Sequence, residues 1–184
     1  MQTVSYILVP SAFGTLGIVW RETGEGPKVS RVLLPHEQTP AQEVVRAAFP
    51  DASPLSCPAI AELGERMQRF LEGDAVVFEL HLVALAKCSE FQRSVLLAEH
   101  RIPRGWVSTY GRIAQSLGVP GGARAVGGAL ARNPFPIIIP CHRAIRADGQ
   151  LGGFQGGLEM KRSLLELEGV EISRAGTVLT DRLF

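Results

Sequence analysis

The residues with the clearest chemical potential are Cys141, His142 and Arg143, which follow one another directly. A thiol is a strong nucleophile only as the thiolate, and an adjacent imidazole can remove its proton. The three residues directly follow the apolar run 136–140 (PIIIP), whose isoleucines and flanking prolines predict a short buried strand. A small core cysteine that happens to precede a histidine is the ordinary interpretation. The alternative is a nucleophile that is held at the end of a strand.

The other two cysteines, Cys57 and Cys88, indicate a reducing compartment. Three cysteines are an odd number, their spacing is wide, and no Cys-x-x-Cys pair occurs. These features argue against a disulfide framework and against a zinc ribbon. His36 and His81 stand at no ligand-like spacing from the two thiols. We therefore expect no metal and a cytoplasmic protein.

The net charge of +1 hides a strongly basic segment. Residues 100–147 contain no Asp or Glu but seven arginines, whereas the rest of the chain holds 12 of the 19 Lys and Arg and all 18 Asp and Glu. Such a patch is the electrostatic footprint of phosphate binding, and the planar guanidinium fork suits phosphates and bases. A run of solvated arginines is the plainer alternative. The complete absence of acid over so long a stretch favours a nucleic acid partner.

The chain must fold into elements that position these groups, and 184 residues suffice for one large domain or two small ones. In the first part, short segments that are rich in β-branched residues and separated by turn signals predict strands. Apolar residues at helical spacing predict helices. No membrane span or signal peptide is expected. The predicted elements are strands over 5–10, 16–22, 28–35 and 76–82 and helices over 41–49 and 59–73. This part, residues 1–88, is expected to be an α/β domain that serves as a scaffold.

The second part, residues 89–184, is expected to be mainly helical. Ser89 is a plausible cap for a helix that continues to Pro103, and Ser108 is expected to cap the next helix, which ends at Gly118. The turn VPGG then leads into a helix over 123–133, and a last helix is predicted over 158–169. Two short helices joined by a glycine-containing turn are typical of a helix-turn-helix.

The helix over 123–133 is nearly bare of side chains, since it contains Ala123, Gly127 and Gly128. Each glycine costs a helix about 1 kcal/mol relative to alanine, so two adjacent ones need a reason. Tight packing against another helix is one reason. Close approach to a narrow surface such as a DNA minor groove is the other, because this helix has few side chains apart from Arg124 and Arg132 that could read bases in a major groove.

Three segments closely resemble the O6-alkylguanine-DNA alkyltransferases: 107–114 (VSTYGRIA), 123–145 (ARAVGGALARNPFPIIIPCHRAI) and 152–169 (GGFQGGLEMKRSLLELEG). The resemblance runs from about Phe91 to Gly169, and the first domain fits only loosely. It implies a ribonuclease-H-like α/β domain followed by a helical, winged-helix-like domain that binds double-stranded DNA through the minor groove.

The resemblance also implies the chemistry. Cys141 would accept the alkyl group from O6-alkylguanine in one irreversible displacement, with O4-alkylthymine left open as a substrate. His142 would act as the base through a water, and Glu168 would orient the histidine, which is triad logic with cysteine as the nucleophile. Tyr110 would donate a proton toward the departing guanine. No cofactor is implied, and the protein is expected to be a monomer.

The remaining site residues follow from the same resemblance. Arg124 would fill the stack after the damaged nucleotide is flipped out, and Asn133 would tie the recognition helix to the turn that carries Cys141. Phe154 stands where the family usually has tyrosine, so a hydroxyl is lost from the pocket. The DNA-facing set is Ala123, Arg124, Gly127, Gly128, Arg132 and Asn133, and the walls of the alkyl pocket are Pro136, Gly152, Phe154, Gln155 and Gly156.

Three other functions compete with this interpretation. Alkyltransferase-like proteins recognise the lesion without transfer, but they replace the acceptor cysteine, and Cys141 is present. A Cys-His hydrolase has no need of an arginine-rich, acid-free segment, and the sequence suggests no oxyanion hole. A helix-turn-helix transcription factor is disfavoured by a recognition helix so poor in base-reading side chains.

Overall fold

The computed structural model describes residues 3–35 and 38–184, so the expectation about His36 lies outside the described residues. Within these ranges no helix is long and apolar enough to cross a membrane. Contacts divide the chain into two compact units, Met1–Ala84 with Pro134–Ile138, and Leu85–Asn133 with Ile139–Phe184. This division falls a few residues before the expected boundary at residue 88, and it assigns one short segment of the second half to the first unit.

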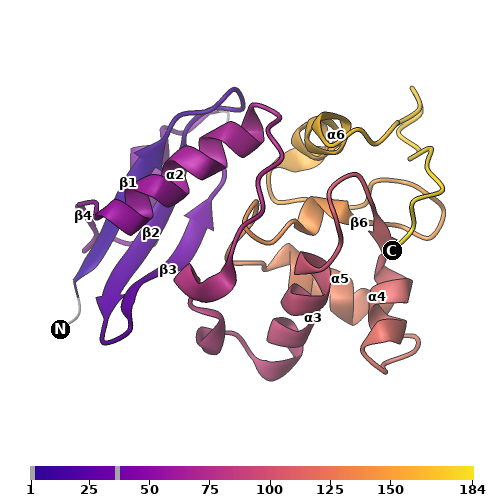
Figure 1. Cartoon of the computed structure of the whole chain (residues 1–184), viewed down its shortest axis with the longest axis horizontal. Helices are drawn as coiled ribbons and strands as arrows, with labels where there is room; N and C mark the ends of the chain where they lie inside the picture. Colours follow the sequence, from indigo (N-terminus) through magenta and orange to yellow (C-terminus); the bar gives the residue numbers. More distant parts are fainter. Residues whose placement is uncertain (1–2, 36–37) are drawn as a thin grey trace. The chain divides into compact units, whose positions relative to one another are not determined.

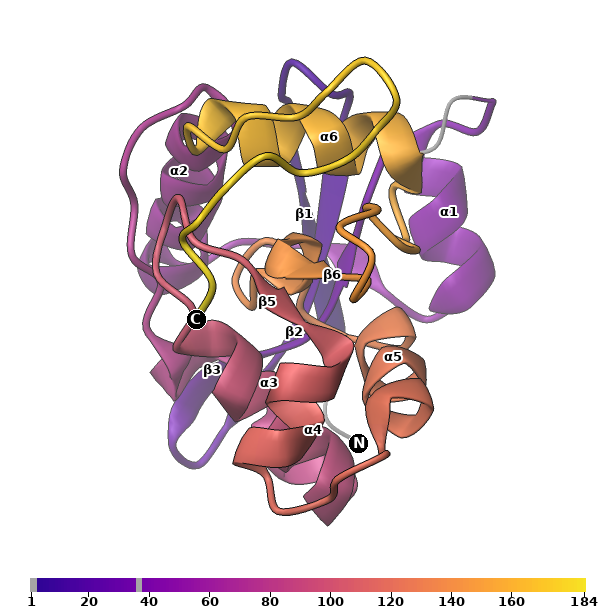
Figure 2. The ribbon, with the colours of Figure 1, turned by 90° about the vertical axis from the view of Figure 1, so that its right-hand side faces the viewer.

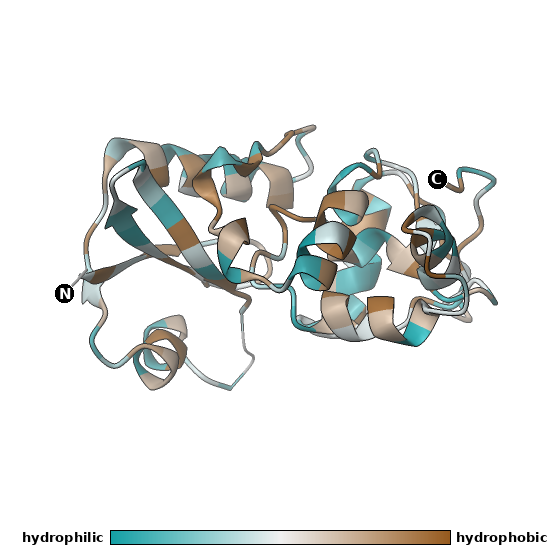
Figure 3. Ribbon diagram, turned by 90° about the horizontal axis from the view of Figure 1, so that it is seen from below, coloured by the Kyte–Doolittle hydropathy of each residue, from teal (hydrophilic) through white to brown (hydrophobic). Residues whose placement is uncertain are grey.

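The first unit is built on a sheet with the strand order β3-β2-β1-β4 (Figure 1). β1, β2 and β3 are antiparallel neighbours, and β4 pairs with β1 in parallel. The strands of this sheet carry both hydrophobic and hydrophilic residues (Figure 3). In β2 the first five residues, 16–20, are all buried, although successive side chains point to opposite faces of the sheet. The elements are β1 (Val4–Val9), β2 (Leu16–Thr23), β3 (Gly26–Leu33), α1 (Ala41–Ala48), β4 (Ser53–Pro54), α2 (Pro58–Leu71) and the 3₁₀ turn η1 (Leu80–Leu82).

Helix α2 packs on this sheet through an apolar stripe that includes Ile60, Leu63 and Met67. The approach is close at Gly64, where an added Cβ atom would lie 3.1 Å from side-chain atoms of both Ile7 and Val9 in β1. The three long strands and both helices confirm the sequence prediction of an α/β unit.

The predicted strand over 76–82 is wrong. Its alternation reflects side-chain burial alone: Val77 is exposed, while Phe78 is buried against Phe70 with ring centroids 5.6 Å apart. The backbone does not join a ladder, and the segment ends in η1 before an isolated bridge between Val29 and Val83. Periodicity reports which side chains are buried, and it does not report where backbone hydrogen bonds go.

The second unit is mainly helical, as the sequence predicted. Helices α3, α4 and α5 pack on one another, and the short parallel pair β5–β6 and helix α6 complete the unit (Figure 2). The elements are the 3₁₀ turn η2 (Leu85–Lys87), α3 (Glu90–His100), β5 (Ser108–Thr109), α4 (Tyr110–Ser116), α5 (Ala123–Ala131), the 3₁₀ turn η3 (Cys141–Arg143), β6 (Ala144–Ile145) and α6 (Gly157–Leu167).

One of the two predicted helix caps is confirmed, and the other is displaced by one residue. Ser89 caps α3, since its hydroxyl oxygen accepts from the Gln92 backbone N–H at 3.3 Å. Thr109 caps α4 instead of Ser108, because Thr109 Oγ1 accepts from Arg112 N at 3.2 Å. The Ser108 hydroxyl is committed elsewhere and donates to the carbonyl of Phe184 at 2.8 Å.

The apolar run before Cys141 is buried, but it is a turn and not the expected strand. Ile137 and Ile138 form the turn, and Ile137 has a φ of 73°. A β-branched residue in this left-handed region is strained by roughly 1–3 kcal/mol and persists only where surrounding packing enforces it. Burial of the three isoleucines, each no more than 1% exposed, supplies that packing.

Candidate functional site: a buried thiol beside a charged network

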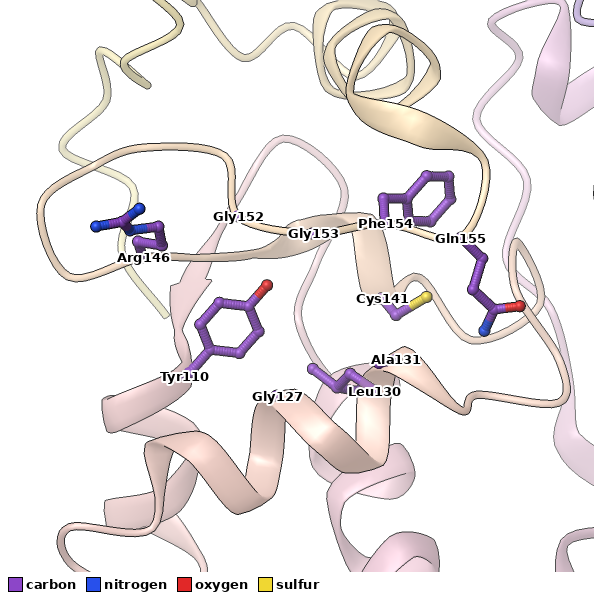
Figure 4. A pocket seen from close by; sticks show the side chains of 10 residues that line it. All are labelled: Tyr110, Gly127, Leu130, Ala131, Cys141, Arg146, Gly152, Gly153, Phe154 and Gln155. Carbon is purple, nitrogen blue, oxygen red and sulfur yellow. The ribbon is translucent and has the colours of Figure 1, made fainter.

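Cys141 is the first residue of η3 and lies just after the turn at 137–138. Its backbone N–H donates to the Ile139 carbonyl at 2.8 Å, and the residue is 5% exposed. The sulfur faces a pocket of about 600 Å³ (Figure 4). The pocket is lined by Tyr110, Gly127, Leu130, Ala131, Cys141, Arg146, Gly152, Gly153, Phe154 and Gln155.

The surroundings of Cys141 oppose ionisation of the thiol. Burial raises the pKa of Cys141 to about 12, and the carboxyl of Glu99 acts in the same direction. A hydrogen bond from the Asn133 side chain and the positive charge of Lys161 work against this shift. The resting protein therefore holds a neutral thiol at neutral pH, and a reaction at sulfur requires a group that removes the proton.

His142, Arg143 and Glu168 form a buried network behind the thiol. His142 Nε2 lies 2.9 Å from Glu168 Oε1, and Arg143 binds both carboxylate oxygens, with Nη2 2.7 Å from Oε1 and Nε 2.8 Å from Oε2. Glu168 terminates α6 as its C-cap residue, and only 1% of its side chain is exposed. A solvent-facing position for Glu168 is thus excluded, and tertiary packing joins it to residues 25 and 26 positions earlier.

The charges of this network determine the tautomer of His142. Burial by itself raises the pKa of Glu168, but hydrogen bonds and charges from His142 and Arg143 outweigh it and hold the pKa at about 2. Burial lowers the pKa of His142, while its hydrogen bond to Glu168 opposes that shift. An ionised carboxylate can only accept, so neutral His142 donates from Nε2 and carries its lone pair on Nδ1. The imidazole is therefore a base held in one orientation.

Tyr110, the first residue of α4, projects into the pocket (Figure 4). Its hydroxyl would lie only 2.7 Å from a Cβ atom added at Gly152, and Gly152 has a φ of +69°. The close approach and the left-handed backbone both require glycine there. Burial, together with Glu99 and Cys141, raises the pKa of Tyr110 to about 12, so its proton stays on the oxygen at neutral pH.

The loop before α6 forms one wall of the pocket. Gln155 Nε2 donates to the Asn133 carbonyl at 2.8 Å, and Asn133 Nδ2 donates to the Ile139 carbonyl at 3.0 Å. These bonds tie the end of α5 to the pocket loop and to the residues just before Cys141. The ring of Phe154 stands edge-on to His142, with centroids 6.3 Å apart.

Two of the expected pocket residues lie elsewhere. Gly156 is the N-cap residue of α6 and does not line the pocket. Pro136 is buried within the segment that belongs to the first unit, and it is likewise absent from the lining.

The face of α5 beside the pocket is open. Arg124 and Arg132 are exposed, and Ala123 is half-buried. A Cβ atom added at Gly127 would meet only the Tyr110 ring at 3.9 Å, and one added at Gly128 would meet only the Arg132 guanidinium at 3.7 Å, both ordinary contacts. Within the described chain no atom crowds these two positions, so tight packing against another helix does not explain why both residues are glycine.

Two charged residues near the site, Glu99 and Lys161, were not singled out from the sequence, and neither was the partner of Arg143. Arg143 follows the two reactive residues directly, yet its carboxylate partner could not be read from local sequence. Glu99 stands four residues after the buried Val95, and Lys161 stands three residues before the buried Leu164. These spacings put both charged residues on the apolar faces of their helices, a signal that could have been noticed.

In the described part of the chain, no cluster of three His, Cys, Asp or Glu side chains could hold a metal ion. Cys57 and Cys88 are both half-buried.

A buried thiol that lines a pocket, beside a helix that exposes two arginines and few other side chains, indicates a DNA-binding protein whose cysteine accepts a group. Residues 90–170 match the 6-O-methylguanine DNA methyltransferase, DNA binding domain. A methylated-DNA–protein-cysteine methyltransferase of Methanothermobacter thermautotrophicus is 41% identical over 157 residues, which are 85% of this chain and 81% of that protein. The chain belongs to the methylated-DNA–protein-cysteine methyltransferase family.

Solved structures agree with this assignment. The O6-methylguanine methyltransferase of Mycobacterium tuberculosis superposes with a TM-score of 0.70 at 35% identity, covering 90% of this chain and 92% of that chain. The structure of Mycobacterium tuberculosis OGT in complex with DNA gives a TM-score of 0.69 at 32% identity, covering 90% and 91%.

Proposed function

We propose that this protein repairs O6-alkylguanine in double-stranded DNA by transferring the alkyl group to Cys141, once per molecule. The observation that carries the proposal is the position of the Cys141 sulfur, which faces the same pocket as Tyr110 and Gly127 of the open α5 face. The thioether formed between the Cys141 sulfur and the alkyl group is not cleaved back to a thiol, so each protein molecule acts as a reagent.

The transfer forms an S–C bond and breaks the C–O bond at guanine O6. His142 removes the thiol proton, either directly or through a water, and Glu168 holds the imidazole in the required tautomer. The neutral state of His142 and the ionised state of Glu168 support this assignment. The thiolate then attacks the alkyl carbon in line with the departing oxygen.

The departing guanine takes up negative charge on its ring, and Tyr110 supplies a proton toward N3. The high pKa of Tyr110 keeps this proton in place until the charge develops. Substrate range depends on the pocket wall, where Phe154 offers an aromatic face without a hydroxyl. We assign the flat side of the flipped base to Phe154 and leave methyl as the reference alkyl group, with O4-alkylthymine as a second base to test.

Access to the base requires flipping, since a stacked base is out of reach. Arg124, exposed at the start of α5, is the side chain we assign to the vacated position in the stack. Replacing Arg124 with alanine is expected to slow repair of duplex DNA at least about tenfold, or ~1.4 kcal/mol, while transfer from free O6-benzylguanine changes little. Rates on the two donors measure this difference.

The matched control is Arg46→Ala, which removes an exposed helical arginine from the α/β unit. Equal losses of rate on duplex and free donor in Arg124→Ala would remove the flipping role.

The face of α5 that carries Gly127 and Gly128 is proposed to lie against the minor groove of DNA. Gly128→Ala is expected to raise the unfolding free energy by up to about 1 kcal/mol, because alanine is the better helix former and the added methyl meets no crowding. The same methyl should weaken duplex binding several-fold, with transfer from free O6-benzylguanine unchanged. Denaturant melts and binding titrations check the two effects. A more stable variant with unaltered duplex affinity would show that the helix does not approach DNA closely.

The test of the function itself is intact mass after mixing the protein with a duplex that carries one O6-methylguanine. One added methyl group, about 14 Da, is the expected result. Tight binding to the lesion with no change of mass would make this chain a recognition protein without transfer.

We infer further that the protein acts as a monomer in the cytoplasm without a cofactor; the odd number and wide spacing of the three cysteines support a reducing compartment. The strand order β3-β2-β1-β4, with an antiparallel meander and a parallel fourth strand, supports a ribonuclease-H-like origin for the first unit. The helix pair α4–α5 with its six-residue connection over 117–122 supports a winged-helix-like second unit.

A further inference from the structure

Two charged side chains that the proposed mechanism does not use are completely buried near Cys141. Glu99 on α3 and Lys161 on α6 are each 0% exposed. Neither carboxyl oxygen of Glu99 has a hydrogen-bond partner of good geometry in the described chain, and the contact with the Ala144 backbone N–H falls short of one. An acid buried with so little compensation is costly, so its position calls for a function.

Lys161 holds the two sides of the site together. Its ammonium donates to the Ala144 carbonyl at 2.6 Å and to the Gly153 carbonyl at 3.2 Å, and it lies 6.0 Å from the centre of the Tyr110 ring. Among the described residues no carboxylate lies within 4 Å of this ammonium. Its positive charge is therefore neutralised by no close partner and acts on the whole buried cluster.

Two potential anions interact electrostatically with this cation. The positive charge of Lys161 lowers the pKa of both Cys141 and Glu99, and each of them in turn raises the pKa of Lys161. Glu99 and Cys141 oppose one another, since a negative Glu99 raises the pKa of the thiol. Arg143 also faces Glu99, but its guanidinium is committed to Glu168.

We propose that Glu99 limits the reactivity of Cys141 at alkaline pH, because its carboxylate and the Cys141 thiolate compete to be the one anion that the buried cluster stabilises. The inference rests on the proposed role of Cys141 as alkyl acceptor. When the cluster loses one proton, that proton can come from the carboxyl, the ammonium or the thiol. Only loss from the thiol creates the nucleophile, and an ionised Glu99 raises the pKa of that thiol, so it lowers the fraction of molecules that carry the thiolate.

The competition has a defined pH window. Burial raises the pKa of Glu99 to about 8 and lowers that of Lys161 to about 8. Below pH 7 Glu99 is a neutral acid, which Gln imitates in shape and charge. One pH unit above its pKa the carboxyl is about nine-tenths ionised, and the charge of the Glu99–Lys161 pair has moved from positive toward negative. Tyr110, with a pKa of about 12, stays neutral throughout.

The test compares Glu99→Gln with the unaltered protein in single-turnover transfer from O6-benzylguanine between pH 6 and pH 9.5. The ratio of the two rates is expected to be near one at pH 6.5 and to rise several-fold, up to about tenfold, at pH 9, since the variant has no competing carboxylate. A ratio independent of pH would overturn the proposal, because a merely structural role for Glu99 changes the rate equally at all pH values.

Glu90→Gln is the matched control, since it removes an exposed glutamate from the same helix. It should leave the rate and its pH profile unchanged. Glu99→Leu also lacks the carboxylate and should reproduce the alkaline gain, which guards against a defect specific to glutamine.

A second readout separates this inference from the proposed function. The rate at which iodoacetamide modifies Cys141, followed in the peptide that contains it, reports the thiolate without any alkyl transfer from guanine. A steeper alkaline rise in Glu99→Gln supports the competition even if no transfer occurs, whereas parallel profiles contradict it. Absence of transfer by the unaltered protein at every pH would overturn the proposed function alone.

Discussion

Replacing Cys141 with serine is expected to abolish alkyl transfer while lesion binding persists. Serine preserves the shape of the side chain, and its hydroxyl can keep a hydrogen bond with Asn133. Its pKa, however, is far above that of a thiol, so neither His142 nor Lys161 can produce a useful concentration of the anion. The about 14 Da increase in intact mass should disappear, and affinity for a duplex with O6-methylguanine should stay within about threefold, a difference of less than 1 kcal/mol.

The two half-buried thiols serve as controls for this experiment. Cys57→Ser and Cys88→Ser should each retain the full increase in mass, because neither thiol lines the pocket that holds Cys141. A methyl group that still appears on Cys141→Ser, or that is lost in either control, would assign the acceptor to another residue.

Replacing Glu168 is expected to have the largest effect on stability. Glu168→Ala leaves the buried guanidinium of Arg143 and the imidazole of His142 without their carboxylate, and breaking a buried ion pair by removing one partner costs ~3–5 kcal/mol. Glu168→Gln preserves the shape and loses the charge, so it should fold but transfer the alkyl group more slowly, with duplex binding unchanged. Urea denaturation and single-turnover rates measure the two effects.

The pH dependence of stability gives an independent check on Glu168. The pKa of this carboxyl is lowered from 4.5 to about 2 in the folded protein. Its contribution to stability is therefore fully present above about pH 4.5 and is lost as the pH falls toward 2. Glu168→Gln should lack this component of acid destabilisation, so the stability difference between the two proteins should narrow as pH falls through that window.

The control for Glu168 is Glu166→Gln. Glu166 is exposed on the same helix and pairs with Arg162 at 3.1 Å, an arrangement that contributes less than about 1 kcal/mol. If Glu168→Gln loses no more stability than Glu166→Gln and reacts at the normal rate, the carboxylate has no part in orienting His142.

Much of the fold was predictable because its signals are local. The β-branched runs with turns between them specify β1, β2 and β3, and the hydroxyl of Ser89 specifies the start of α3. The cap of α4 was misplaced by one residue, since Ser108 and Thr109 are equivalent by composition. The contact of Ser108 with the Phe184 carbonyl, 76 residues away, distinguishes them.

Two predicted strands failed for a shared physical reason. Segments 76–82 and 136–140 carry the apolar pattern of a strand, and each buries apolar side chains. A strand also needs a neighbour for its backbone hydrogen bonds, and that neighbour is supplied by tertiary structure. In the described chain neither segment forms a ladder of consecutive pairs. The first becomes an irregular connection, and the second has only single bridge positions, at Pro136 and Ile139, around a turn with a strained Ile137.

The sequence by itself determined the reactive Cys141-His142 pair, the acid-free arginine segment and the bare helix, since each is a matter of residue types in succession. The tertiary structure decided which distant groups surround the thiol. It brought Glu168 to His142, and it buried Glu99 and Lys161 within electrostatic reach of Cys141. Local pattern cannot specify such contacts, because the burial that shifts a pKa and the partner that offsets it come from separate helices that meet only when the chain is packed.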